Sequence, residues 1–91
     1  MVSEPLVAEV LLDARGLEPP QPLERALEES AQLAAGQRLR MIHHREPCLL
    51  YPLLAKRGFC HRTVAATDER FELLIWRDGD VVAEAESKRN N

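Results

Sequence analysis

The residues with the most chemical potential in this chain of 91 residues lie in two short stretches. One contains Arg15 and the prolines that follow it, and the other runs from His43 to Cys48. Guanidinium and imidazole groups, together with free N–H groups at the start of a helix, are common ligands of a small anion or a carboxylate. We therefore expect an anion-binding or partner-binding site made by seven residues, namely Arg15, Pro19, Pro20, Gln21, His43, His44 and Arg45.

A simpler interpretation of these stretches stays open. Prolines have no N–H to donate, and Glu18 and Glu46 partly neutralise the positive charge. In that case Arg45 and Glu46 form only a solvated pair beside a turn.

Cys48 is the candidate nucleophile of the two stretches. A thiol near the start of a helix and beside an arginine or histidine is more reactive than usual. The interpretation we favour is a small apolar side chain packed beside Leu49 and Leu50. A helix of about ten residues, which spans about 15 Å, separates Cys48 from Cys60, so we expect no disulfide between them.

The histidine pair does not indicate a metal site. His43 and His44 are adjacent in a predicted strand, so their side chains point to opposite faces. His43 has the same parity as Leu39 and Met41, which predicts a buried imidazole that makes a hydrogen bond. The chain has no CxxC, HExxH, glycine-rich phosphate loop or Ser/His/Asp pattern. We therefore expect no metal, no cofactor and no autonomous enzymatic activity.

The composition favours one domain that acts on a protein partner. The chain is 45% hydrophobic, and 12 basic against 15 acidic residues give a net charge of −3. Excess negative charge is unfavourable for contact with a nucleic-acid backbone. No apolar run approaches the roughly 18 residues of a membrane span, and the first residues do not resemble a signal peptide. We expect a cytoplasmic protein that binds neither nucleic acid nor membranes.

The spacing of apolar residues predicts the elements that position these side chains. Alternation predicts strands over 8–13, 37–44, 59–66 and 70–77. Helical spacing predicts a first helix from Pro22 to Gly36 and a second that ends before Gly58. Pro52 leaves two possibilities for the second helix, a kinked one from Pro47 or a shorter one that starts near Tyr51.

This βαβαββ order predicts an α/β fold, specifically an α+β two-layer sandwich with a four-stranded mixed sheet and both helices on one face. Parallel pairing of the first two strands would bring the two chemical stretches to one edge of the sheet. We expect the domain to span 8–77, between an extension over 1–7 and a turn with a flexible tail over 78–91. The predicted core comprises Val10, Leu12, Leu23, Leu27, Leu39, Met41, Leu53, Leu54, Phe71, Leu73 and Ile75.

A second set of apolar residues has the opposite parity. Ile42, Leu74 and Trp76 face away from the predicted core. Either this outer face binds a partner or a second copy, or Val81 and Val82 add paired residues that cover it.

The stretch Leu12-Asp-Ala-Arg-Gly-Leu17, followed by Pro19-Pro-Gln-Pro22 at the head of a helix, resembles the TusA/SirA family of small bacterial sulfur carriers. Those proteins have a Cys-Pro-x-Pro motif whose cysteine receives sulfur as a persulfide, and the matching position here is Pro19. The later stretch, which includes Arg45-Glu-Pro47 and Gly58-Phe59, is similar to an uncharacterised branch of TusA-like domains.

The resemblance implies a small non-catalytic TusA-like binding or adaptor domain in bacterial redox or sulfur metabolism, monomeric or weakly dimeric. Its partner would be a protein of a redox or sulfur relay. Two alternatives stay open, sulfur transfer through Cys48 as a displaced persulfide site and an oligomerisation module that uses Trp76. If docking survives the loss of the thiol, protonation of His43 or His44 near a pKa of about 6.5 should strengthen binding of an acidic partner.

Overall fold

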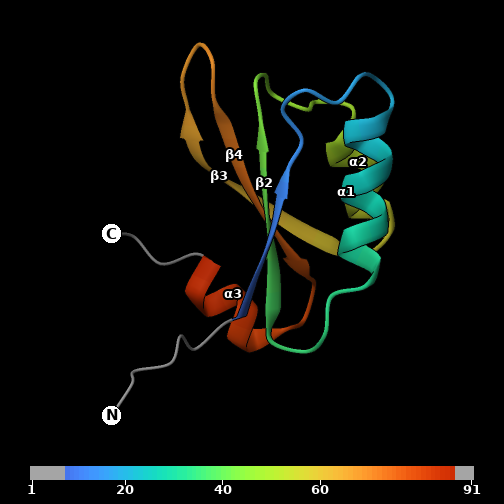
Figure 1. Ribbon diagram of the computed structural model, residues 1–91. Helices are drawn as coiled ribbons and strands as arrows, with labels where there is room; N and C mark the ends of the chain where they lie inside the picture. The colour runs from blue at the N-terminus through green and yellow to red at the C-terminus, as the bar shows by residue number, and fades with distance from the viewer. Residues whose placement is uncertain (1–7, 88–91) are drawn as a thin grey trace.

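A four-stranded mixed sheet forms the centre of the fold in the computed structural model, which describes residues 8–87 (Figure 1). The elements are β1 (Ala8–Asp13), α1 (Gln21–Ala31), β2 (Gln37–His43), α2 (Leu50–Lys56), β3 (Phe59–Ala66), β4 (Phe71–Arg77) and α3 (Val81–Ser87). The strand order is β1-β2-β4-β3, with β1 parallel to β2 and β4 antiparallel to both of its neighbours. The predicted sandwich is therefore confirmed. The predicted extension over 1–7 and residues 88–91 lie outside the described residues.

The core lies between the sheet and the helices α1 and α2. Alternate residues of three strands point toward these helices and are at most 4% exposed, namely Leu12, Leu39, Met41, Leu73 and Ile75. Helix α2 adds Leu50 and Leu54, which lie one turn apart and therefore share a face. The prediction of Leu53 as a core residue is wrong, because Leu50 takes that place and Leu53 is only partly buried.

Helix α1 ends five residues before the predicted terminus at Gly36. The chain leaves the helix after Ala31 and makes a turn in which the Gln37 N–H donates to the Ala34 carbonyl at 3.0 Å. The Gln37 side chain closes the same turn, since its Oε1 accepts from the Ala34 N–H at 2.7 Å. Gly36 has a φ of +79°, so it serves this turn instead of the helix end.

Helix α2 takes the shorter of the two predicted forms. It begins at Leu50, after a turn in which the Leu50 N–H donates to the Pro47 carbonyl at 2.9 Å. Pro52 is then the third residue of the helix, where a backbone N–H has no partner within the helix in any case. The helix therefore tolerates this proline without a kink.

The predicted turn after Arg77 is confirmed at Asp78 and Gly79, but the prediction for the residues from Val81 to Ser87 is wrong. Instead of paired residues and a flexible tail, the chain forms helix α3, which lies on the side of the sheet away from α1 (Figure 1). Asp80 caps this helix, because its Oδ1 accepts from the Ala83 N–H at 3.2 Å. Its Oδ2 accepts from the Gly36 N–H at 2.7 Å, which ties α3 to the loop before β2.

Helix α3 covers part of the outer face of the sheet. Ala83 packs on Leu74 and Trp76, which are 3% and 1% exposed. Val81 and Val82, the residues predicted to cover this face, are themselves 75% and 47% exposed. Trp76 is therefore covered from within the chain and is no exposed surface for oligomerisation.

A chain of ion pairs crosses the uncovered part of the outer face. Arg40 bridges two strands, since its Nε lies 2.9 Å from Glu9 Oε2 and its Nη1 lies 2.8 Å from Glu72 Oε1. Arg38 also binds Glu9, and Arg70 also binds Glu72. Hydrogen bonds from Arg70 and Arg40 lower the pKa of Glu72. Burial raises the pKa of Glu9, but Arg40 and Arg38, which both bind Glu9, lower its pKa by more, so the net shift is downward.

Candidate functional site

The loops that follow β1 and β2 meet in a groove beside the starts of α1 and α2. Its volume is about 320 Å³, and prolines and leucines supply most of its wall. We call it the proline groove, and its lining residues are Pro19, Pro20, Pro22, Leu23, His43, Arg45, Glu46, Pro47, Cys48, Leu49 and Leu50.

The parallel pairing of β1 with β2 places this groove. Asp13 lies opposite Ile42 in the register, so the chain leaves both strands at the same edge of the sheet. The Ala14 N–H donates to the Ile42 carbonyl at 2.7 Å, which holds the first loop against the second as they diverge. The Pro19–Pro20 peptide bond is cis. Two stretches that lie far apart in the sequence therefore form one wall.

Four of the seven predicted site residues line the groove. They are Pro19, Pro20, His43 and Arg45. Gln21 is exposed at the start of α1, and His44 is exposed beyond the end of β2, where its Nε2 accepts from Arg45 Nε at 3.3 Å. His44 thus lies beside a wall residue without lining the groove.

Arg15 does not join the groove. Its Nε and Nη2 donate to the two carboxylate oxygens of Asp13 at 2.9 and 2.8 Å. The Asp13 carboxylate lies only two residues away, so this bidentate pair forms locally. The hydrogen bonds of Arg15 lower the pKa of Asp13 to about 2. Of the two arginines that were predicted to bring positive charge to this site, only Arg45 lines the groove.

His43 is the buried polar residue of the wall. It is 7% exposed, as predicted, and its ring makes an edge contact with His44 at 4.4 Å between centroids. Its Nδ1 is buried and has no hydrogen-bond partner among residues 8–87. Burial lowers the pKa of His43, and His44 and Arg45 lower it further. The groove therefore presents a neutral imidazole near pH 7.

Cys48 opens to solvent, so the prediction that its side chain is packed is wrong. The turn before α2 points Cys48 and Leu49 outward, while Leu50 enters the core. Leu49 is 79% exposed as a result. The groove thus combines a free thiol with an exposed apolar side chain on its rim.

Tyr51 holds one wall of the groove in place and was not predicted. Its hydroxyl donates to Glu46 Oε2 at 3.0 Å, and its ring stacks on His61 with centroids 4.2 Å apart. Burial and the Glu46 carboxylate raise the pKa of Tyr51 to about 12. Tyr51 and Glu46 are five residues apart in the sequence. This spacing is outside the usual helical pairs, so no sequence pattern indicated their contact.

Among residues 8–87, no three or more His, Cys, Asp or Glu side chains gather closely enough to hold a metal ion. No helix within the same residues is long and apolar enough to cross a membrane.

The fold and the groove together define a small α+β domain with a concave, mostly apolar groove at one edge of its sheet. Residues 11–77 match the family described as uncharacterized conserved protein (DUF2249), and the chain belongs to this family. No curated protein and no solved structure matches the chain. The family match spans every strand from late β1 to β4 and ends before α3.

Proposed function

We propose that the protein is a non-catalytic binding or adaptor domain whose recognition site is the proline groove. The observation that carries the proposal is the convergence of Pro19, Pro20, His43 and Arg45 in one groove. An apolar wall with a few polar groups is typical of a site that binds a ligand by shape and orients it by hydrogen bonds.

The wall favours a segment of a partner protein over a small ion alone. Leucines and prolines offer apolar contact, and exposed Leu49 would be buried by a bound chain. Arg45 would pair with a carboxylate of that chain, and the His43 imidazole would supply a hydrogen bond. The expected partner is therefore a protein with an acidic and apolar segment.

The setting of this proposal rests on the TusA resemblance. It suggests a bacterial redox or sulfur pathway, with docking retained although Pro19 replaces the carrier cysteine. We place the domain in the cytoplasm, where reducing conditions would keep Cys48 and Cys60 as thiols.

Site-specific crosslinking in cells of the native host tests the partner. A photo-reactive amino acid at Leu49, in the groove, should capture a protein, and Arg45→Ala should abolish the capture. The matched control is the same amino acid at Leu11, which is 60% exposed on the outer face. Equal capture from both positions, or capture that ignores Arg45→Ala, would contradict the proposal.

Titration with phosphate, sulfite and thiosulfate tests the charged anchor. Backbone amide shifts should move at Pro47-flanking residues and near Arg45, and Arg45→Ala should remove them. Arg15→Ala is the control, because Asp13 already holds its guanidinium. Shifts that persist without Arg45, or that need Arg15, would exclude this groove as the anion site.

Sulfur transfer through Cys48 is a second candidate function, favoured by the exposure of its thiol in the groove. The Cys48 thiolate would attack the outer sulfur of a donor persulfide. The S–S bond of the donor would break, the donor would leave as a thiolate, and Cys48 would become the persulfide.

Incubation with a cysteine desulfurase and sulfur-labelled cysteine distinguishes this candidate from a non-catalytic adaptor. Mass spectrometry should find labelled persulfide on Cys48, lost in Cys48→Ser and kept in Cys60→Ser. An unlabelled protein would leave the adaptor role as the function of the groove.

A further inference from the structure

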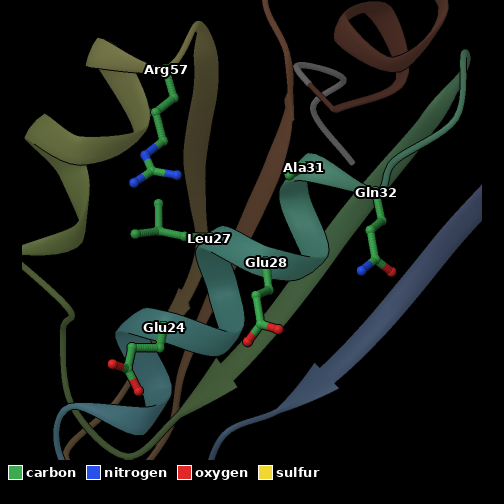
Figure 2. Close-up of a pocket in the computed structure, with 6 residues that line it drawn as sticks. All are labelled: Glu24, Leu27, Glu28, Ala31, Gln32 and Arg57. Atoms are coloured by element: carbon green, nitrogen blue, oxygen red, sulfur yellow. The ribbon is translucent and has the colours of Figure 1, made fainter.

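A second hollow lies on the exposed side of α1 and shares no residue with the proline groove. Its volume is about 660 Å³, and Figure 2 shows its lining residues, Glu24, Leu27, Glu28, Ala31, Gln32 and Arg57. We call it the α1 hollow. Five of these residues come from α1 or the residue after it, and Arg57 comes from the end of α2.

The charged groups of the α1 hollow have no ion-pair partners within residues 8–87. Neither the Glu24 and Glu28 carboxylates nor the Arg57 guanidinium forms a salt bridge. On the same helix, by contrast, Arg25 and Glu29 pair at 2.8 Å. The hollow therefore presents both signs of charge, unpaired, around a partly apolar floor.

The positive and negative groups of the α1 hollow lie on opposite sides of it. Half-buried Leu27 lies between the Arg57 guanidinium on one side and the Glu24 and Glu28 carboxylates on the other (Figure 2). A two-fold axis in the plane of an interface exchanges the two sides of each surface. A two-fold axis that passes near Leu27 would therefore place Arg57 of each copy beside Glu24 and Glu28 of the other copy, which gives two equivalent sets of contacts.

We propose that the α1 hollow is a self-association surface, and that its occupant is a second copy of this chain. Two sets of Arg57–carboxylate pairs cross the interface, and they enclose Leu27 and Ala31 of both copies. The arrangement is isologous, so it closes at a dimer and does not build a filament. It leaves the proline groove of each copy open, since the two sites share no residue.

The same features set the strength of the dimer. One leucine, one alanine and exposed ion pairs contribute little compared with the buried centre of an obligate interface. The net charge of −3 on each copy adds a general repulsion. The dimer is therefore weak and appears as the protein concentration rises.

A charge exchange across the hollow tests the proposal by sedimentation velocity. The unmodified protein should shift from one copy toward two as its concentration increases. Arg57→Glu makes the hollow wholly acidic, and the double variant Glu24→Arg/Glu28→Arg makes it wholly basic, so each alone should stay monomeric. An equimolar mixture of the two variants should associate again, and more tightly than the unmodified protein.

Two controls separate this surface from others. The pair exchange Arg25→Glu/Glu29→Arg, on the same helix but outside the hollow, should leave association unchanged. Arg45→Ala, in the proline groove, should also leave it unchanged, so the dimer and the proposed function can fail independently. A protein that is monomeric throughout, a mixture that does not associate, or association that survives Arg57→Glu would each overturn the proposal.

Discussion

The two faces of the sheet are built from alternate residues of the same strands, yet they are stabilised in different ways. The inner face buries Leu39, Met41, Leu73 and Ile75 against α1 and α2 at no more than 1% exposure. The outer face buries Leu74 and Trp76 under the short helix α3 and also carries the ion pairs around Arg40.

This difference shows which face determines stability and which face adds to it. Burial of large apolar side chains is the dominant favourable contribution to folding. Ion pairs that are partly exposed contribute little each, and solvent and salt weaken them. The inner face should therefore respond most to loss of side-chain volume, and the outer face should respond to capping, pH and salt.

The largest expected effect is the loss of an inner leucine. Leu73→Ala removes a side chain with 0% exposure and should lower the free energy of unfolding by about 2–5 kcal/mol. Leu11→Ala makes the same substitution on the outer face, at 60% exposure, and should change it by less than about 0.5 kcal/mol. Urea denaturation of both variants checks the contrast, which similar losses would disprove.

A smaller effect is expected from the cap of α3. Asp80→Ala removes the acceptor for two N–H groups, those of Ala83 and Gly36. Helix α3 should then loosen from the outer face, and the fluorescence of Trp76, the only tryptophan, should shift to the red while the inner core stays folded. Asp68→Ala in the β3–β4 turn is the control; an unshifted spectrum for Asp80→Ala would show that packing alone holds α3.

The response to pH should separate the two faces. Burial lowers the pKa of His43, so the unfolded chain binds more protons below the usual value of 6.5, and stability is lost as the pH falls through that region. Glu9 and Glu72 on the outer face have lowered pKa values, so their contribution is lost only below the usual value of 4.5.

Urea midpoints measured across this pH range check the assignment. His43→Gln should flatten the loss of stability near pH 6.5 and leave the loss below pH 4.5 unchanged. His44→Gln should weaken the loss near pH 6.5 only slightly, because burial is the larger cause of the lowered pKa of His43 and His44 a lesser one. The flattening should be partial, because burial also lowers the pKa of His61. If His43→Gln lost as much stability near pH 6.5 as the unmodified protein, His43 would not be the cause of that loss.

The smallest effect is expected within the ion pairs. A double-mutant cycle on Arg40→Met and Glu72→Gln should give a coupling of about 0.2–1 kcal/mol, which falls at high salt. A coupling well above this range would mean that the outer face stabilises the fold as strongly as a core contact does.

The inner face was predictable from the sequence, because alternation in strands and helical spacing are local properties. Leu39, Met41, Leu73 and Ile75 were assigned correctly on that basis. Helix α3 was missed because its residues have little apolar periodicity of their own. Its position depends on Ala83 meeting Trp76 and on Asp80 meeting Gly36, and both contacts exist only after the sheet has formed.

The groove was predictable in its location but only partly in its residues. Parallel pairing of the first two strands was enough to bring Pro19 and His43 together. The direction of single side chains could not be predicted in this way. Arg15 binds Asp13, two residues away, and the tight turn before α2 points Cys48 outward. Such outcomes depend on competing local contacts instead of on periodicity.

The position of β4 in the sheet constrains the order in which the chain can fold during its synthesis. It is the last of these four strands to be made, yet it lies between β2 and β3. Until Phe71–Arg77 leaves the ribosome, β2 has a partner on one side only and β3 has none. The four-stranded sheet can therefore be completed only after β4 has been made, because β4 supplies the second partner of β2 and the partner of β3.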